Sequence, residues 1–355
     1  MQQQNPLRSI PPPLLEWYGQ NARVLPWREH PTPYRVWVSE IMLQQTRVEA
    51  VKPYFERFVA ALPDVNALAA APEEQLLKLW EGLGYYSRVK NMQKAAREVV
   101  ERFGGDLPKS REELLTLPGI GDYTSGSIAS IAFGLPVPAV DGNVLRVISR
   151  LTASYEDIAK PAVKKAVEHL VEDVIPAGRA GDFNQALMEL GATVCLPGAS
   201  PLCERCPVRE TCGAFTLGIQ GELPVKQKKA PRRVEEKTVF LLVCDGKAAL
   251  QKRPDKGLLA GMWEFPHAPG FLSPEQAEQT LEEWGIVPAK VSGLKPAKHI
   301  FSHVEWHMRG YLATLQPGET PARFCWHTVQ ELKDQYALPT AYEAFVKLFY
   351  SLSEE

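Results

Sequence analysis

The sequence predicts two domains of different fold class, a mainly α-helical N-terminal domain followed by a smaller α+β domain. Residues 14–217 carry apolar side chains three and four positions apart, which is the period of amphipathic helices. Residues 218–236 lose this period and are rich in glycine, proline and basic residues, as linkers often are. Beyond them, alternating strand patterns are mixed with helical ones. We therefore expect domains at 1–217 and 237–355, joined by a linker at 218–236.

Six stretches of the first domain are expected to be helices because each places its apolar residues on one face. In chain order they are Tyr34–Thr46, Val48–Ala61, Glu73–Trp80, Lys90–Phe103, Lys164–Val174 and Asp182–Cys195. In the second domain, Asp245-Gly246 predicts a tight turn between two strands, because both positions tolerate the positive φ angles of such a turn. The elements expected there are strands Thr238–Cys244, Lys247–Arg253, Glu305–Leu315 and Arg323–Trp326, and helices Pro274–Trp284 and Thr340–Leu352.

Bulk composition restricts the functional classes. The chain has 355 residues, 45% of them hydrophobic, and a formal net charge of −2. Such a chain does not attract nucleic acid indiscriminately, so any nucleic-acid binding has to be local. No run approaches about 18 uninterrupted apolar residues, and the first residues, MQQQNPLRSI, lack the organisation of a secretory signal. We expect a cytoplasmic protein that makes no membrane contact.

Four cysteines gather in the segment 195–212 as Cys195-x7-Cys203-x2-Cys206-x5-Cys212. A disulfide framework is disfavoured because nothing in the sequence points to secretion. Structural zinc sites usually present two short Cys-x2-Cys pairs, whereas this segment has one close pair between longer arms. Zinc remains an alternative, and an iron-sulfur cluster held by four thiolates fits the spacing better.

The segment LPGIGDYT, residues 117–124, separates two helical patterns at Glu112–Thr116 and Ser125–Phe133. Gly119 and Gly121 allow the backbone to turn sharply and to expose its amide groups. Amide groups at the start of a helix can hold a phosphate oxygen without any arginine. The pattern therefore predicts a helix-hairpin-helix motif at about residues 112–133; the alternative, a plain turn with a glycine C-cap, does not need both glycines.

Two carboxylates stand in unusual surroundings. Glu40 is the only charged residue between Arg35 and Arg47. Loss of hydration there would raise its pKa, as a general acid that works near neutral pH requires. Asp141 lies where a proline-rich loop gives way to a helical pattern, a position typical of a helix N-cap, whose hydrogen bonds keep a carboxylate ionised. Together they are typical of a pair that cleaves a glycosidic bond, although a solvated Glu40 and a purely structural Asp141 are the simpler interpretations.

Five motifs carry a resemblance to a known family. They are WVSEIMLQQTRV at 37–48, EGLGYYSR at 81–88, LPGIGDYT at 117–124, AVDGNVLRV at 139–147 and the four cysteines. Together they resemble the endonuclease III superfamily of DNA base-excision glycosylases and, within it, the MutY family of adenine DNA glycosylases. The resemblance extends to Phe301-Ser302-His303, in what looks like that family's MutT-like (Nudix-like) C-terminal domain.

The resemblance implies a catalytic set. Glu40 matches the acid that protonates adenine and later helps to activate water, and Asp141 matches the carboxylate that stabilises the sugar cation. Asn143 aligns with a residue near the water or the flipped nucleotide. Tyr123 stands where bifunctional relatives have a Schiff-base lysine, so a monofunctional hydrolase is implied.

The resemblance also implies how DNA is bound. The walls of the adenine pocket match Leu25, Trp27, Arg28, Gln185 and Met188. Gln45 and Tyr85 match the residues that fill the gap left by a flipped nucleotide. The base opposite adenine would be 8-oxoguanine or guanine, with Ser302 accepting a hydrogen bond from 8-oxoguanine, Phe301 and His303 supporting its loop, and Thr46 and Leu83 adding contacts.

The implied protein is a monomer that binds double-stranded DNA and carries a [4Fe-4S] cluster on Cys195, Cys203, Cys206 and Cys212. The first cysteine arm is one residue longer than the family's usual C-x6-C-x2-C-x5-C. The second domain lacks a working Nudix box, which suggests a domain that reads DNA rather than one that hydrolyses diphosphates. Two alternatives remain: a glycosylase with lyase activity on oxidised pyrimidines, and a non-catalytic protein that binds mismatches or lesions.

Overall fold

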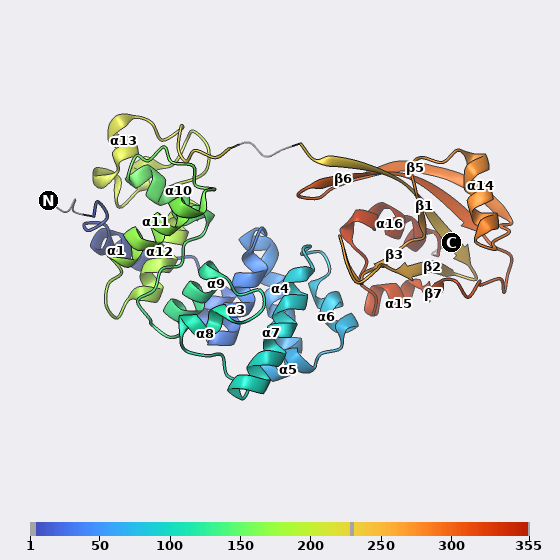
Figure 1. Cartoon of the computed structure of the whole chain (residues 1–355), viewed down its shortest axis with the longest axis horizontal. Helices are drawn as coiled ribbons and strands as arrows, with labels where there is room; N and C mark the ends of the chain where they lie inside the picture. The colour runs from blue at the N-terminus through green and yellow to red at the C-terminus, as the bar shows by residue number, and fades with distance from the viewer. Residues whose placement is uncertain (1–4, 228–230, 354–355) are drawn as a thin grey trace. The chain divides into compact units, whose positions relative to one another are not determined.

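The computed structural model describes residues 5–227 and 231–353, so residues 228–230 of the expected linker lie outside the described part. The chain divides into two compact units. Unit 1 comprises residues 1–70 and 90–228, and unit 2 comprises residues 71–89 and 229–355. The elements of each unit can be followed in Figure 1. No helix in the described ranges combines the length and apolar composition needed to cross a lipid bilayer.

Unit 1 is built from helices. They are α1 (Pro11–Asn21), α2 (Pro26–Glu29), α3 (Pro33–Leu43), α4 (Val48–Ala61), α5 (Val65–Ala70), most of α7 (Ser87–Phe103), α8 (Arg111–Leu115), α9 (Asp122–Ser127), a π-helical turn at Ile128–Ala132, α10 (Gly142–Leu151), α11 (Pro161–Glu172), α12 (Ala180–Thr193), short 3₁₀ turns at Cys203–Arg205 and Arg209–Thr211, and α13 (Gly213–Leu217).

Local signals explain where the helices of the site begin. The Thr32 hydroxyl accepts a hydrogen bond from the Arg35 N–H, and Pro33 occupies the first turn, so α3 starts there. Asp141 caps α10 by accepting from the Val144 N–H. Helix α12 packs against α1 and α10 around buried apolar residues such as Phe183, and this cluster forms one core of unit 1.

Glycines let α9 approach the segment before Asp141 and let α12 approach α10. A Cβ on Gly126 of α9 would lie 2.1 Å from the Pro138 carbonyl oxygen, and one on Gly191 of α12 would lie 2.6 Å from the Asn143 Cβ. Neither distance can be tolerated, so only glycine permits this packing. The buried Asn184 side chain also bonds to Val137 O and Ala139 N, at 2.9 and 3.0 Å. The segment that leads to Asp141 is therefore held from both sides.

The described part of unit 2 contains a mixed sheet of seven strands with the order β3-β2-β1-β6-β5, with β4 also paired to β1 and β7 to β2. The strands are β1 (Arg233–Cys244), β2 (Lys247–Lys252), β3 (Trp263–Glu264), β4 (His267–Pro269), β5 (Lys290–Ile300), β6 (Val304–Thr314) and β7 (Cys325–Thr328). The helices are α6 (Glu73–Trp80), α14 (Pro274–Glu283), α15 (Val329–Asp334) and α16 (Glu343–Leu352), with a 3₁₀ turn at Thr340–Tyr342. β1 and β6 are parallel, and the other pairs are antiparallel.

Both faces of the sheet in unit 2 are covered. Successive side chains of β1 alternate between two apolar clusters: Val239 packs with residues of α15 and α16, and Phe240 packs with residues of α14. Residues 238–242 of β1 are therefore buried without interruption. The predicted tight turn is confirmed, because Asp245 and Gly246 have φ angles of 48° and 70° between β1 and β2.

The predicted fold class is confirmed, while several element boundaries differ. The helix expected to reach Thr46 ends at Leu43, because Gln45 has a φ of 58°. β1 begins at Arg233, inside the stretch expected to be a linker, because it pairs with β6 from its first residue. Strand β5 was not expected: it is a mostly exposed edge strand with a proline and a register shift between Leu294 and Ala297.

Replacement of Gly126 by alanine should destabilise the protein by about 3 kcal/mol, because the new methyl group forces α9 away from Pro138. Chemical denaturation would measure the change. Gly19→Ala in α1 is the control: nothing lies within 4 Å of its added Cβ, so it should be neutral or stabilise by about 0.5–1 kcal/mol. Equal stability of the two variants would contradict the packing described here.

Candidate active site

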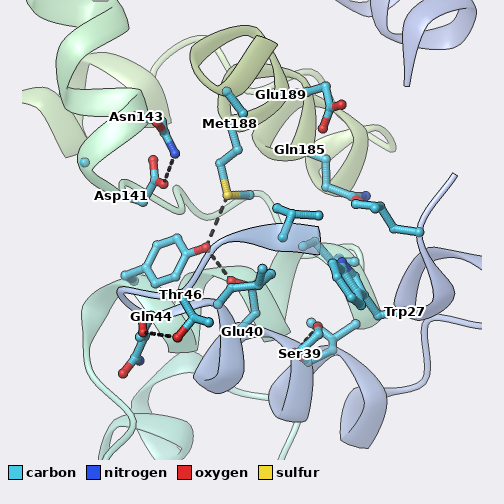
Figure 2. A pocket seen from close by; sticks show the side chains of 18 of the residues that line it. Trp27, Ser39, Glu40, Gln44, Thr46, Asp141, Asn143, Gln185, Met188 and Glu189 are labelled. Atoms are coloured by element: carbon cyan, nitrogen blue, oxygen red, sulfur yellow. Dashed lines mark hydrogen bonds between the residues drawn. The ribbon is translucent and has the colours of Figure 1, made fainter. Parts of the chain in front are cut away.

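A cavity of about 660 Å³ lies within unit 1, and the two carboxylates singled out in the sequence both line it. Figure 2 shows Glu40 from α3 and Asp141 from the start of α10 around this space, with Met188 and Gln185 on α12. Residues about 100 positions apart in the chain are therefore brought to one site. Further lining residues come from α2 and the segment before it, the segment after α3, the start of α4, α9, α11 and the π-helical turn.

Glu40 is buried, with 6% of its surface exposed, on a helix whose neighbours Val38 and Ile41 are buried too. Burial is the main cause that raises the pKa of Glu40 to about 7; the nearby charge of Asp141 acts in the same direction, and a hydrogen bond from Tyr123 acts against it. The phenol of Tyr123 donates that bond to Glu40 Oε2. At neutral pH this carboxyl group can therefore both hold and release a proton.

Asp141 has its oxygens fixed by its own helix. Oδ1 accepts from the Val144 N–H at 2.8 Å, and Oδ2 accepts from the Asn143 amide at 2.8 Å. These bonds lower the pKa of Asp141, but desolvation is the larger influence and raises it above the ordinary value. The hydrogen bonds expected from an N-cap are thus present, whereas the expected net lowering of the pKa is absent.

Tyr123, on α9, contacts residues of both α3 and α12 across the cavity. Its hydroxyl lies 3.3 Å from the Met188 sulfur and bonds to Glu40. Burial raises the pKa of Tyr123 well above its usual value, and the two neighbouring carboxylates raise it further. The phenol therefore stays protonated and acts as a hydrogen-bond donor to Glu40.

The predicted walls of the base pocket also line the cavity. Leu25 and Trp27 are almost fully buried, and the Trp27 ring meets Phe55 edge to face at 5.5 Å. Arg28 lies over the Tyr18 ring and bonds to Glu189 at 2.8 Å. Gln185 and Met188 complete the set from α12.

Gln45 and Thr46 line the cavity directly after α3 ends. Gln45 adopts a left-handed backbone, with a φ of 58°, which is unfavourable for a residue with a side chain. The Thr46 hydroxyl bonds to the Gln44 carbonyl at 3.4 Å, a contact drawn in Figure 2. The chain is therefore sharply bent where it leaves the helix.

The predicted hairpin lies between α8 and α9. Gly119 has a φ of 78°, and a Cβ there would lie 2.9 Å from the Asn91 side chain. Gly121 has an ordinary φ of −103° and is the N-cap of α9, with nothing within 4 Å of an added Cβ. Gly119 is thus required by the fold of the chain itself, whereas at Gly121 the open space leaves the helix N-terminus accessible to a ligand.

The four cysteines of the 195–212 segment line a second, small cavity together with apolar residues such as Val147 and Leu190. None of the described cysteines forms a disulfide. Burial raises the pKa of Cys203 and Cys212, and the nearby Cys195 thiol raises both as well. Four converging thiols with an apolar surround fit a cysteine-ligated iron-sulfur cluster. Among the described residues, no three His, Cys, Asp or Glu side chains have the spacing to hold a single metal ion.

The longer first cysteine arm forms a closed loop. The N–H groups of Leu196 and Leu202 both bond to the Val194 carbonyl at 2.9 Å, so the residues between them bulge out. The buried Arg150 side chain donates to Leu196 O and Gly198 O, each at 2.8 Å. Arg150 therefore holds this loop to α10.

Comparisons with known proteins identify the family of this chain. The model for "HhH-GPD superfamily base excision DNA repair protein" matches residues 38–173, and the model for "NUDIX domain" matches residues 238–348. The adenine DNA glycosylase of Mus musculus is 37% identical over 95% of this chain and 77% of its own length. That of Homo sapiens is 38% identical over 87% and 67%. The chain belongs to the adenine DNA glycosylase family.

Solved structures agree with the fold of unit 1. A thermostable thymine-DNA glycosylase superposes with a TM-score of 0.52 and 29% identity, over 58% of this chain and 94% of the other. Endonuclease III in a non-covalent DNA complex gives 0.50 and 25%, over 58% and 95%. The predicted family is thus confirmed, and so is an enzyme class: this adenine DNA glycosylase cleaves N-glycosidic bonds in DNA during base excision repair.

Other predicted site residues of this glycosylase do not line the cavity. In unit 2, Leu83 is buried, and Tyr85 is 44% exposed with a φ of 48°. Phe301, Ser302 and His303 form the turn between β5 and β6, where Phe301 packs on Trp306 at 4.9 Å and the other two are exposed. Phe301 therefore anchors the turn, and Ser302 lies at its tip.

Several cavity residues escaped the sequence analysis. Glu189 is fully buried and bonds to both Arg23 and Arg28, which holds the Arg28 side chain at the cavity. Burial acts to raise the pKa of Glu189, but the hydrogen bonds and positive charges of Arg23 and Arg28 together lower it below its ordinary value. Gln44 and Lys164 also line the cavity. Only the helical period of α12, which places residues 185, 188, 189 and 192 on one face, could have indicated Glu189.

The Glu40 pKa predicts a pH-dependent stability effect. Because the folded-state pKa is raised from 4.5 to about 7, the native state holds a proton that the unfolded state has lost, and stability falls as pH rises across this window. Glu40→Gln removes this loss, so at pH 8 it should be more stable than the wild type by up to about 3 kcal/mol. Below pH 4 the difference should vanish.

Denaturation curves at several pH values would test this, with the exposed Glu56→Gln on α4 as the control that shows no such trend. A Glu40→Gln variant that is less stable than the wild type at pH 8 would contradict the conclusion that burial disfavours the ionised form of Glu40.

Proposed function

We propose that this enzyme removes adenine paired with 8-oxoguanine or guanine from duplex DNA by monofunctional hydrolysis. The single observation that carries the proposal is that Glu40, with a pKa of about 7, and the hydrogen-bonded Asp141 line one cavity. Cleavage of a glycosidic bond to a base needs an acid for the leaving group and a negative charge beside the sugar. The non-catalytic alternative falls away, because the family consists of enzymes.

Glu40 acts first as the acid. It transfers its proton to N7 of the flipped adenine, the bond from N9 to C1′ breaks, and the bonding electrons leave with the base. The Tyr123 hydroxyl orients Glu40 throughout. The resulting Glu40 carboxylate then accepts a proton from the water that adds to C1′, so the acid is regenerated.

Asp141 stabilises the positive charge that develops on the sugar. Its two oxygens are fixed by Val144 N–H and by the Asn143 amide, so it needs no rearrangement when the charge appears. Asn143 in turn bonds to Arg146, whose guanidinium also bonds to the Gly191 and Cys195 carbonyls. Asn143 therefore supports the carboxylate and lies at the cavity, where the attacking water could be held.

The adenine reaches this cavity only after it leaves the duplex. Leu25, Trp27 and Arg28 would form one side of its pocket, with Gln185 and Met188 on the other. Gln45 and Tyr85, both in left-handed conformations, would fill the vacated position in the duplex. The open N-terminus of α9 at Gly121 would hold a phosphate.

Recognition of the opposite base is assigned to Ser302, with contacts from Thr46 and Leu83. The exposed position of Ser302 at the tip of the β5–β6 turn supports this assignment, because its hydroxyl can accept from the N7–H that distinguishes 8-oxoguanine. Phe301 holds the turn by packing on Trp306, and His303 bonds to Ser302 at 3.2 Å.

Monofunctional chemistry is supported by Tyr123, because a buried protonated phenol cannot form a Schiff base. One observation favours the alternative lyase activity: Lys164, an amine, lines the same cavity from α11. A strand-nicking assay without added base would separate the two.

The proposed cofactor is a [4Fe-4S] cluster held by Cys195, Cys203, Cys206 and Cys212. Four thiols that converge on an apolar cavity support this set. When bound, the cluster would cross-link the 195–212 segment and so fix its fold. Arg150 and Arg146, which bond to the carbonyls of this segment, would join it to the helix that Asp141 caps.

Glu40→Gln should slow adenine excision about 10³-fold and leave binding of the lesion duplex unchanged, because the amide keeps the shape but carries no acidic proton. In the wild type, excision should fall as pH rises through about 7, where the acid loses its proton. Excision would be measured on duplexes with adenine opposite 8-oxoguanine, guanine or thymine, each followed by hot alkali. An equal loss of binding and excision, or strand cleavage without alkali, would oppose the proposal.

Cys206→Ser should lower the iron content from about four atoms per chain and remove the brown colour, because one ligand of the cluster is lost. Metal analysis of the purified protein would measure this. Cys325→Ser, an exposed cysteine in β7, is the control that should keep its iron. Zinc in place of iron in the wild-type protein would replace the proposed cofactor.

A further inference from the structure

Within unit 2, two charged side chains of α6 bind main-chain groups of the segment 332–338. The Lys78 ammonium donates to Leu332 O at 2.8 Å and to Tyr336 O at 3.4 Å, and pairs with Glu81 at 2.6 Å. Glu81 uses its other oxygen to accept from the Leu338 N–H at 2.8 Å. The ammonium thereby lies at the C-terminal end of α15, where a positive charge is favourable. Both helices are labelled in Figure 1.

Glu81 is also the first residue of a strained loop. Helix α6 ends at Trp80, and Gly82, Gly84 and Tyr85 then follow with φ angles of 97°, 68° and 48°. Such a conformation costs free energy at Tyr85 and persists only where the surroundings hold it.

Two side chains hold the loop from within. Trp80 Nε1 donates to Gly84 O at 3.0 Å, and the Arg88 guanidinium donates to Leu83 O and Gly84 O. Arg88 lies over the Trp80 and Tyr85 rings, and burial lowers its pKa to about 10. Through its hydrogen bond from the Leu338 N–H, Glu81 also attaches this loop to the segment 332–338.

From these contacts we infer that Glu81, together with Lys78, is a positioning residue that fixes the loop presenting Tyr85 to DNA. The inference rests on the proposed function, in which Tyr85 fills the vacated position in the duplex. The segment 332–338 belongs to the C-terminal part of the chain, as does the Ser302 turn. The C-terminal part of the chain thus carries Ser302, which would contact the opposite base, and also supports Tyr85, which would take the place of adenine.

The contacts of Glu81 differ from an ordinary surface ion pair. Glu74, on the same helix, pairs with the Lys252 side chain at 3.5 Å, and both are nearly half exposed. A pair of that kind contributes little to stability. Lys78 and Glu81 are less exposed and bond to three backbone groups, which have fixed positions.

The test is a double-mutant cycle measured by single-turnover excision of adenine opposite 8-oxoguanine. Glu81→Ala should slow excision about 10-fold, and Glu81→Gln should recover part of the loss because its amide oxygen can still accept from Leu338. In a Tyr85→Ala background, Glu81→Ala should change the rate by no more than about 2-fold, because its effect passes through Tyr85. Glu74→Ala is the matched control and should behave as wild type.

A spectroscopic readout separates positioning from general destabilisation. With 2-aminopurine in place of the adenine, the fluorescence rise on flipping should be smaller for Glu81→Ala than for wild type. Lys78→Met, which removes the bonds to Leu332 and Tyr336, is a second variant should Glu81→Ala fold poorly.

A wild-type rate for Glu81→Ala and Lys78→Met, or an undiminished loss in the Tyr85→Ala background, would overturn the inference alone. A wild-type rate for Tyr85→Ala would instead remove the proposed role of Tyr85, and the inference with it.

Discussion

Burial of the Glu40 carboxyl is the constraint on which the rest of the site depends. A carboxyl group surrounded by apolar side chains loses its hydration and requires a hydrogen-bond donor. That donor is Tyr123 on α9, so α3 and α9 have to pack together. Helix α9 in turn fits only because Gly126 allows the chain at Pro138 to pass beside it. Three residues further on that chain reaches Asp141, so burying one acid also places the other.

The two carboxylates share a cavity but differ in how their charge is supported. Glu40 receives a bond from one phenol, whereas Asp141 receives a backbone N–H and an amide that both favour its ionised form. Desolvation raises the pKa of both carboxyl groups, and the negative charge of Asp141 also acts to raise the pKa of Glu40. The result is one acid that can keep its proton near neutral pH, beside another better equipped to carry charge.

Sequence reasoning succeeded where a residue's role follows from its immediate neighbours. The apolar surroundings of Glu40, the turn at Asp245-Gly246 and the N-cap at Asp141 were all evident from adjacent residues. It failed where the role depends on distant partners. The sequence around Glu189 is that of an ordinary helix, and only the folded chain brings Arg23 and Arg28 to its carboxylate. The pKa of Asp141 is raised because packing removes water from the carboxylate, an effect larger than that of its local hydrogen bonds. Strand β5 lacked any apolar alternation because an edge strand with an exposed face does not need it.

The arginines explain how a nearly neutral chain can still be a DNA enzyme. Arg146 and Arg150 are buried and donate hydrogen bonds to carbonyl groups in and near the cysteine segment. Arg23 and Arg28 bond to Glu189. These four cations organise the protein and are not free to form a basic surface. Under the proposed function, accessible backbone amides such as that at Gly121 contribute attraction to phosphate, and Gln45 and Tyr85 in their strained loops contact the bases. On this proposal, the shape of the backbone at a few positions, rather than the total charge, adapts the fold to DNA.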